Sequence, residues 1–137
     1  MPMPRVLHVD DDPTVRRAVR RLFESSGWRV ASAQNAAEVD DALARGSFDV
    51  AVIDLVIGED DGLELIDRLA RRDPELVLVL FSGTLTPAIE DRALALGAAR
   101  CLPKSAPSSQ LVGEAYALIG RSGVVSIGPC RGKVTEG

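Results

Sequence analysis

The fold is decided by the stretch Val6-Leu7-His8-Val9-Asp10-Asp11-Asp12-Pro13. Its apolar first half is typical of a short buried strand, so the three carboxylates follow that strand's carboxyl end. In open α/β sheets, ligands bind in the crevice outside the carboxyl ends of the strands. Adjacent carboxylates repel one another, and a divalent cation with oxygen ligands is the usual reason for a chain to hold them together. The stretch therefore predicts one strand of an α/β sheet and a cation site at its end.

The composition is that of an ordinary globular domain. The chain has 137 residues, of which 46% are hydrophobic and 26% charged, enough for one domain with a proper core. The net charge of -4 argues against direct binding of nucleic acid. We find no apolar stretch long enough to cross a bilayer and expect no secretory signal. Cys101 and Cys130 form neither a metal motif nor a disulfide framework, so we expect a cytoplasmic protein with reduced thiols.

Strands and helices are predicted to alternate. Apolar runs predict strands at residues 5–9, 28–32, 50–53, 76–81 and 100–102. Helices are predicted to follow caps at Asp12, Asn35, Asp61 and Thr86, with a fifth helix at residues 108–119 and an acidic loop at 54–61. This pattern predicts a doubly wound parallel sheet of five strands with helices on both faces. We expect residues 1–120 to form this one domain, and the Gly- and Ser-rich residues 121–137 to be a flexible C-terminal tail or linker.

Polar groups follow four of the predicted strands. Asp10 and Asp11 follow the first strand, Asp54 the third, Ser82 the fourth and Lys104 the fifth. These strand ends lie on one edge of a parallel sheet. Carboxylates suit Mg²⁺, and a carboxylate can also be a nucleophile towards phosphorus. A metal, an ammonium group and a hydroxyl are what a transferring phosphoryl group needs around its oxygens.

At these residues the chain resembles the receiver domain of bacterial two-component response regulators, which has a flavodoxin-like fold. The resemblance covers residues 5–119 and rests on five motifs in order: Val6-Leu7-His8-Val9-Asp10-Asp11-Asp12-Pro13, Asp49-Val50-Ala51-Val52-Ile53-Asp54-Leu55, Asp61-Gly62-Leu63-Glu64-Leu65, Leu78-Val79-Leu80-Phe81-Ser82-Gly83 and Cys101-Leu102-Pro103-Lys104.

The resemblance implies a role for each site residue. Asp54 would accept the phosphoryl group, and Asp10, Asp11 and Asp54 would hold Mg²⁺ together with the backbone carbonyl of Val56. Ser82 and Lys104 would bind the phosphoryl oxygens.

The resemblance also implies partners. The phosphodonor would be a sensor histidine kinase or a histidine phosphotransfer protein, and the phosphorylated form would signal to a downstream protein partner through a surface change. The domain would be no enzyme beyond catalysing its own phosphorylation and dephosphorylation. Its docking surface would be the basic face of the first helix, which carries Arg16, Arg17, Arg20 and Arg21.

The sequence departs from the family pattern at several positions. Cys101 replaces the usual aromatic switch residue, Ser105 replaces the proline that commonly follows the lysine, and Gly58 stands where proline is usual. The apolar Val56, two residues after Asp54, cannot hydrogen-bond an attacking water, and Thr84 offers only a small hydroxyl. We therefore predict slow self-dephosphorylation, over minutes or longer.

Two other functional classes stay open at this point. The run Asp10-Asp11-Asp12-Pro13-Thr14 matches the DxDxT motif of haloacid-dehalogenase-type phosphatases, with Asp10 as nucleophile and Asp12 as general acid. That family needs a further acidic metal-binding pair after its lysine, and the only acids beyond Lys104 are Glu114 and Glu136. The second alternative is a receiver-like interaction module that phosphate does not switch.

Overall fold

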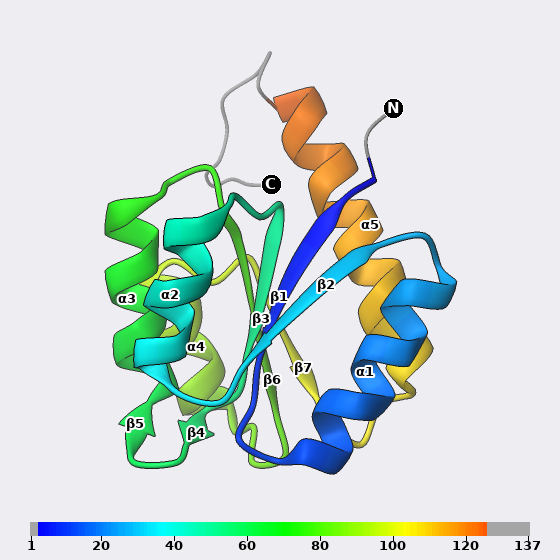
Figure 1. Cartoon of the computed structure of the whole chain (residues 1–137). Coiled ribbons are helices and arrows are strands. Elements are labelled where there is room, and N and C mark those ends of the chain that lie inside the picture. Colours follow the sequence, from blue (N-terminus) through cyan, green and yellow to red (C-terminus); the bar gives the residue numbers. More distant parts are fainter. Residues whose placement is uncertain (1–2, 126–137) are drawn as a thin grey trace.

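The computed structural model describes the backbone of residues 3–125 and the side chains of residues 3–120. Its elements alternate along the chain as predicted (Figure 1). They are β1 (Arg5–Val9), α1 (Pro13–Ser25), β2 (Arg29–Ala33), α2 (Ala36–Arg45), β3 (Val50–Ile53), β4 (Val56–Ile57), β5 (Asp60–Asp61), α3 (Gly62–Arg72), β6 (Val77–Ser82), α4 (Pro87–Leu96), β7 (Arg100–Pro103) and α5 (Ser108–Val125).

Five of the strands form one parallel sheet in the order β2-β1-β3-β6-β7. Helices α1 and α5 cover one face, and α2, α3 and α4 cover the other (Figure 1). From β1 the chain moves to one side to form β2 and then to the other side to form β3, so the winding reverses next to β1. Such a reversal opens a crevice at the carboxyl ends of the strands, which positions a site there. The predicted fold class is confirmed.

The core consists of two apolar layers, one on each face of the sheet. Strand β3 is buried at all four positions because helices cover both of its faces. Neighbouring residues of this strand therefore enter opposite layers, with Ile53 in one and Val52 in the other. The central strands are thus fixed on both sides, which holds the residues that follow them in place.

Four helices begin with the caps that the sequence predicts, at Asp12, Asn35, Asp61 and Thr86. The Asp12 carboxylate accepts the Thr14 N–H at 2.9 Å, and Pro13 occupies the first helical position. At α2, the Asn35 side chain accepts the Glu38 N–H at 2.9 Å. The Glu38 carboxylate in turn accepts the N–H of Gln34, at 2.9 Å. The capping-box pattern is confirmed, except that Glu38 bonds the N–H of Gln34 and not that of the N-cap residue Asn35.

Two parts of the chain differ from the prediction. The expected acidic loop contains a short antiparallel hairpin, in which β4 pairs with β5 across the turn at Gly58 and Glu59. Helix α5 continues to Val125, whereas the sequence predicts its end at residue 119, so residues 121–125 of the expected tail are helical. The rest of that predicted tail, residues 126–137, lies outside the described residues. Among the described residues, we find no helix long and apolar enough to cross a membrane.

Three aromatic side chains join α1, the turn before β2 and α5 at the amino end of the sheet. Trp28 is 1% exposed and packs edge-on against Phe23 and Tyr116, with ring centroids 5.1 and 5.0 Å away. The Tyr116 hydroxyl also donates a hydrogen bond to the Ser26 carbonyl. This cluster fastens α5 to the turn that precedes β2.

Candidate functional site

Asp10 and Asp54 extend their strands by one hydrogen bond each. The Asp10 N–H donates to the Ala33 carbonyl at 3.0 Å, and the Asp54 N–H donates to the Val9 carbonyl at 3.1 Å. Both residues therefore leave the sheet in register. Carboxylate oxygens of Asp10, Asp11 and Asp54 all lie within 4.8 Å of one another. The structure brings together the three acids that the sequence predicts to meet.

The ammonium group of Lys104 bridges two of these acids. Its Nζ lies 2.7 Å from Asp10 Oδ2 and 2.9 Å from Asp54 Oδ2. The lysine is aimed there by its backbone, because its N–H donates to the Ser82 carbonyl at 2.9 Å. Three carboxylates and one ammonium group leave two negative charges in excess, the charge that one divalent cation balances. The oxygen donors also match the preference of Mg²⁺, so the residues present fit this ion.

Asp10 is the most buried acid of the group, at 1% exposure. Its carboxylate accepts the Asp12 N–H at 2.9 Å in addition to the lysine. Its backbone carbonyl accepts a hydrogen bond of 2.7 Å from the guanidinium of Arg16, one turn into α1. A buried charge needs such partners, and Asp10 has them.

The pKa values of Asp54 and Lys104 are both raised, but for different physical reasons. Burial raises the pKa of the Asp54 carboxyl above 3.8, and the nearby Asp10 charge adds to this, against the lowering effect of Lys104. Burial alone would lower the pKa of Lys104, but its hydrogen bonds and charge attraction to Asp10 and Asp54 outweigh burial and raise it above 10.5. The lysine is therefore firmly cationic, while Asp54 carries a charge that its surroundings disfavour.

Gly62 allows the loop after β3 to close around Asp54. A Cβ at Gly62 would overlap the carbonyl oxygen of Asp54. The Gly62 N–H donates to the Leu55 carbonyl at 2.8 Å, and the Leu55 N–H donates to Asp54 Oδ1 at 2.7 Å. The start of α3 thus lies directly against the backbone of the candidate phosphoacceptor.

The other predicted site residues are less closely engaged. The hydroxyl of Ser82 is buried and accepts the Thr84 N–H at 3.1 Å, and none of its hydrogen bonds within the described residues reaches a site side chain. Val56 lies in β4 with a 60% exposed side chain, and its backbone carbonyl as a metal ligand stays a prediction. Asp11 is exposed, and its Oδ2 accepts the Gly58 N–H at 3.0 Å.

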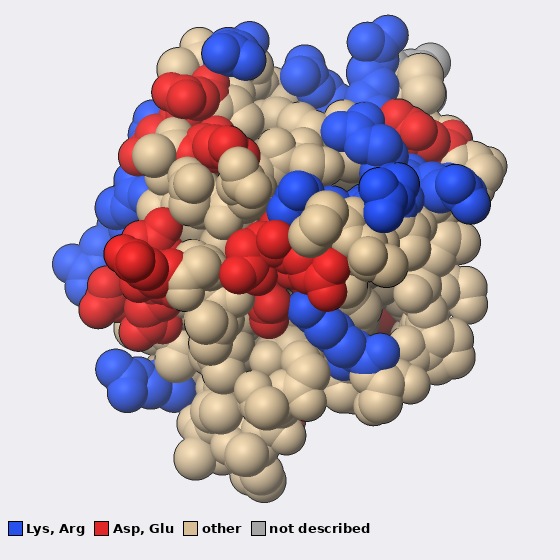
Figure 2. Space-filling view, turned by 60° about the horizontal axis from the view of Figure 1, so that its bottom comes forward, with Lys and Arg blue, Asp and Glu red and all other residues tan. Residues whose placement is uncertain are grey.

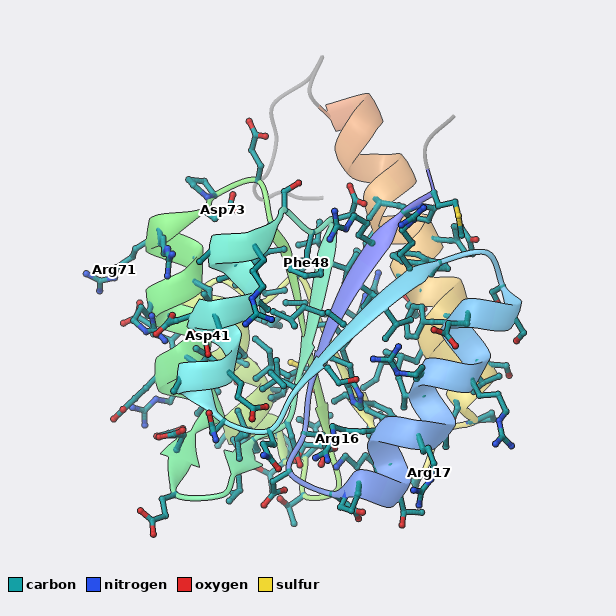
Figure 3. The ribbon with its side chains drawn as sticks, viewed as in Figure 1. Arg16, Arg17, Asp41, Phe48, Arg71 and Asp73 are labelled. Carbon is teal, nitrogen blue, oxygen red and sulfur yellow. The ribbon has the colours of Figure 1, made fainter. Side chains whose placement is uncertain are left out.

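The basic face of α1 divides into anchored and exposed residues. Arg16 bonds Asp10, and Arg20 donates to the Val30 carbonyl at 3.2 Å and the Ser32 hydroxyl at 3.3 Å on the edge strand β2. Figure 3 shows Arg16 between α1 and the strand ends, whereas Arg17 lies on the outer side of the helix. Arg17 and Arg21 are exposed, and the Arg20 side chain, although bonded to β2, stays 40% exposed. Arg16 is thus the residue of this face that is turned furthest towards the site.

The face at the strand ends has an uneven charge distribution. Figure 2 shows acidic side chains near its centre, basic side chains above and to the right of them, and a lower part that carries neither. The acidic centre would attract a cation. The basic side chains beside it would attract a negatively charged surface.

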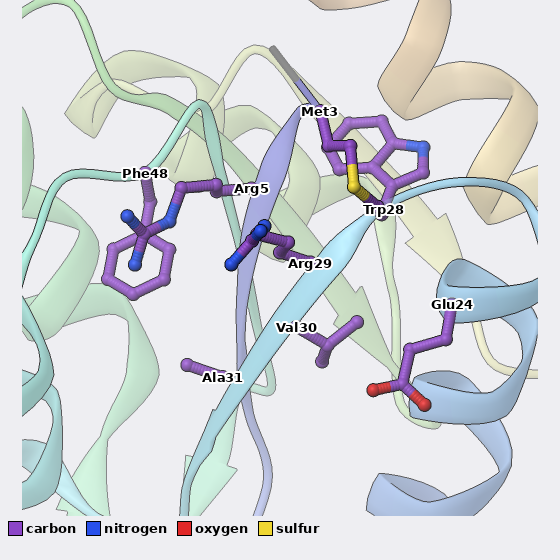
Figure 4. A pocket seen from close by; sticks show the side chains of 8 residues that line it. All are labelled: Met3, Arg5, Glu24, Trp28, Arg29, Val30, Ala31 and Phe48. Carbon is purple, nitrogen blue, oxygen red and sulfur yellow. The ribbon is translucent and has the colours of Figure 1, made fainter.

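A separate cavity lies at the opposite end of the sheet. It has a volume of about 520 Å³ and borders the edge strand β2 (Figure 4). Arg5 and Arg29 line it, and the Arg5 guanidinium lies over the Phe48 ring at 5.1 Å from its centroid. None of the site residues lines this cavity, so it is not part of the candidate site.

The structure bears on one alternative function, the phosphatase, and on one departure from the family pattern, Cys101. The Asp12 carboxylate caps α1, which leaves it poorly suited to be the general acid of a phosphatase. Cys101 is buried on β7, where burial and the nearby Glu90 raise the pKa of its thiol to about 11. The residue at the aromatic switch position is therefore a small, neutral part of the core.

Sequence reasoning did not predict several contacts around the site. From the sequence, Arg16 is expected on a surface face of the first helix, the Gly58 amide has no expected role, and Gly62 is only one residue of a motif. A glycine beside an acidic pair at residues 58–60 is a weak hairpin signal that could have directed attention to Gly58. The backbone contact of Gly62 leaves no comparable signal in one sequence.

Comparison with known proteins identifies the family. Residues 6–116 match the model of the response regulator receiver domain. The alginate biosynthesis transcriptional regulatory protein AlgB of Pseudomonas syringae pv. tomato is 34% identical over 109 residues, which are 78% of this chain and 24% of AlgB. The methanol utilization control regulatory protein MoxX of Paracoccus denitrificans is 33% identical over 122 residues, 87% of this chain and 54% of MoxX. The chain thus spans from about a quarter to about half of the length of these curated relatives.

Solved structures show the same fold. A CheY-like response regulator receiver domain protein from Methanospirillum hungatei JF-1 superposes with a TM-score of 0.85 at 20% identity, covering 90% of this chain and 98% of that one. A response regulator from Burkholderia pseudomallei, solved with a phosphorylated aspartic acid, calcium ion and citrate, has a TM-score of 0.76 at 24% identity, covering 92% and 75%. Together with the family model, these findings place the chain in the response regulator receiver domain family, as a regulatory domain.

Proposed function

We propose that this receiver domain accepts a phosphoryl group on Asp54 with the help of Mg²⁺. The observation that carries the proposal is the Lys104 ammonium, which lies within 2.9 Å of both Asp10 and Asp54 at the centre of the acidic group. The closeness of three carboxylates and one ammonium group supports a nucleophile, a cation and a metal-binding group acting together. The phosphorylated aspartic acid and calcium ion named for the Burkholderia relative support the same chemistry.

In the proposed reaction, a carboxylate oxygen of Asp54 attacks the phosphorus of a phosphohistidine in line with the leaving nitrogen. The P–O bond to Asp54 forms as the P–N bond breaks, and the histidine nitrogen leaves with the electron pair of that bond. Asp10, Asp11, Asp54 and the Val56 carbonyl would hold Mg²⁺, which supplies charge neutralisation for the phosphoryl oxygens. The Lys104 ammonium would bind an oxygen of the transferred phosphoryl group, as a second positive charge beside Mg²⁺. The Ser82 hydroxyl would bind another of these oxygens after its side chain moves towards Asp54.

The raised pKa of the half-buried Asp54 carboxyl fits a nucleophile. A carboxylate that its surroundings disfavour is more reactive than a fully solvated one, and its conversion to an acyl phosphate removes the disfavoured charge from the carboxyl. The Leu55 N–H, 2.7 Å from Oδ1, orients the group for attack.

The partners follow from the reaction. The phosphodonor is a sensor histidine kinase or histidine phosphotransfer protein that docks near α1, where Arg17 and Arg21 are exposed, and the receiver acts in the cytoplasm. A downstream protein reads the phosphorylated surface. Direct contact with nucleic acid is not part of the proposal, although relatives such as AlgB are named as transcriptional regulators and are longer than this chain.

The test is incubation with acetyl phosphate and Mg²⁺, followed by intact mass measurement. We expect one phosphoryl adduct in the unsubstituted protein and in Asp41→Asn, which changes an exposed acid of α2, and none in Asp54→Asn. No adduct in the unsubstituted protein, or an adduct that survives Asp54→Asn, would instead favour the alternative of an interaction module that phosphate does not switch. That alternative draws on Cys101, which leaves the switch position without an aromatic ring.

A further inference from the structure

Asp11 is held differently from the other two acids of the site. Asp10 and Asp54 are fixed by the Lys104 ammonium and by a backbone N–H each. Asp11 is exposed, and within the described residues its carboxylate accepts one hydrogen bond, from the Gly58 N–H at 3.0 Å. The orientation of this acid therefore depends on where the β4–β5 hairpin places one amide group.

The hairpin directs this amide through a backbone conformation that favours glycine. Gly58 has φ +63° and is the first residue of the two-residue turn between Ile57 and Asp60. Glycine at this turn position is typical of tight hairpins. The residue also supplies the N–H that bonds Asp11, which a proline in the same place would lack.

The far strand of the hairpin is anchored to α2. Asp60 Oδ2 accepts the N–H of Ala36 at 2.9 Å. Ala36 is the first residue of α2, where helical N–H groups have no partner within the helix. The hairpin thus lies between two hydrogen bonds, one to Asp11 and one to the start of a helix packed on the sheet.

We propose that Asp60 and Gly58 are positioning residues that adjust the Mg²⁺ affinity of the site by orienting Asp11. The inference rests on the proposed metal site. The bond to α2 fixes the hairpin, and the hairpin fixes the Gly58 amide, which bonds Asp11 Oδ2 at 3.0 Å. The amide would thereby keep the Asp11 carboxylate beside Asp10 and Asp54, where ligand oxygens of all three acids lie within 4.8 Å of one another. Groups that orient metal ligands are worth about 10- to 100-fold in metal affinity in other sites. Because the hairpin is itself exposed, loss of its anchor to α2 is expected to cost about tenfold, at the lower end of that range.

Two variants remove the anchor in different ways. Asp60→Ala removes the acceptor together with a charge. Ala36→Pro removes the donor and keeps the charge, and proline is favoured at the first position of a helix. The preceding residue, Asn35, has φ -162° and ψ 174°, an extended conformation that a following proline tolerates.

Two further variants are matched controls. Glu59→Ala removes one negative charge from the neighbouring turn residue, which makes no side-chain hydrogen bond in the described structure. Asp60→Asn removes the charge but keeps an oxygen that accepts the Ala36 N–H. These controls separate the hydrogen bond from long-range attraction of the cation.

The experiment is titration of each ¹⁵N-labelled protein with Mg²⁺, followed by amide NMR spectra, which also report folding. We expect Asp60→Ala and Ala36→Pro to bind Mg²⁺ about tenfold more weakly than the unsubstituted protein, and Glu59→Ala and Asp60→Asn to bind within about twofold of it. The Gly58 amide signal should shift in the two anchor variants before any Mg²⁺ is added.

Unchanged or tighter binding in the anchor variants, or equal weakening in Glu59→Ala, would overturn this inference and leave the metal site standing. Failure of the unsubstituted protein to bind Mg²⁺ would overturn both the metal site and the inference. If Asp60→Ala is unfolded, Ala36→Pro decides the result, because it keeps every side chain of the hairpin.

Discussion

At the scale of single residues, the site joins the buried Asp10 and the half-buried Asp54 to one lysine. Lys104 reaches both Asp10 and Asp54 because β7, β3 and β1 end at the same edge of the sheet. The three acids and the lysine could be predicted as a group, since parallel strands bring their carboxyl ends together. The direction of the Ser82 side chain could not be predicted in the same way, because its hydroxyl accepts the Thr84 N–H of its own loop.

Val56 provides a prediction about the lifetime of the phosphorylated form. Its apolar side chain is 60% exposed in the strand that follows Asp54 and offers no hydrogen bond to a water molecule. We expect Val56→Asn to speed self-dephosphorylation about tenfold, because a side-chain amide can orient the attacking water. The measurement is loss of the phosphoryl adduct over time in Mg²⁺.

The dephosphorylation rate of Val56→Asn is compared with that of a control substitution in the same hairpin. Glu59→Ala lies in the same hairpin and should leave the rate near that of the unsubstituted protein, which we expect to lose its phosphoryl group over minutes or longer. Decay within seconds in the unsubstituted protein, or an unchanged rate in Val56→Asn, would contradict the role given to Val56.

At the scale of elements, the start of α3 fixes the loop that carries Asp54. Because a Cβ at Gly62 would overlap the Asp54 carbonyl oxygen, Gly62→Ala must displace either α3 or the backbone of Asp54. We expect it to lower the free energy of unfolding by about 2 kcal/mol and to reduce formation of the phosphoryl adduct. Urea unfolding and intact mass measure the two effects.

A second glycine makes a matched comparison. Gly113 lies within α5, and a Cβ there would meet no atom within 4 Å. Gly113→Ala should therefore raise the free energy of unfolding by about 0.5–1 kcal/mol, through helix propensity alone. Equal effects of the two substitutions would show that the contact of Gly62 with Asp54 is unimportant.

Long elements and their caps could be predicted from the sequence, whereas the short hairpin and the end of α5 could not. Strands such as β3 are evident from continuous apolar runs, and the caps at Asp12 and Asn35 are evident from side-chain type. The strands of the β4–β5 hairpin have two residues each, too few for any periodicity to appear. The sequence predicts the end of α5 at residue 119 because Gly and Ser are frequent in the residues that follow, whereas the helix continues to Val125.

At the scale of the whole molecule, a buried histidine in the central sheet makes stability depend on pH. His8 is 1% exposed, and its Nδ1 has no hydrogen-bond partner in the described structure. Burial, with smaller contributions from Lys104 and Arg16 and against the opposing charge of Asp10, lowers the pKa of His8 from 6.5 to about 4. Below pH 6.5 the unfolded chain binds a proton that the folded protein does not bind until about pH 4.

We therefore expect the free energy of unfolding to fall as the pH drops from 6.5 to 4, by roughly 3 kcal/mol from His8 alone. His8→Met has a side chain of similar volume and no titrating group. Urea unfolding of both proteins across this range should show a difference that changes with pH, while the titration of the carboxylates cancels. Parallel curves would contradict the prediction.

The fold of the whole domain could be predicted because its signals are repeated along the chain. Alternating strands and helices, with apolar central strands, leave few topologies open. The end of α5 could not be predicted in the same way, because one helix boundary has no repeated signal along the chain.

The aromatic cluster at the amino end of the sheet has a practical consequence. Trp28 is the one tryptophan of the chain, and it lies between α1 and α5, at the sheet edge opposite the carboxylates. Its fluorescence should therefore report whether α5 stays fastened to the sheet, and should respond little to a cation at the far edge. Trp28 fluorescence can therefore serve as an internal reference for unfolding. The signal of a fluorescent label attached near Asp54 can be compared with it.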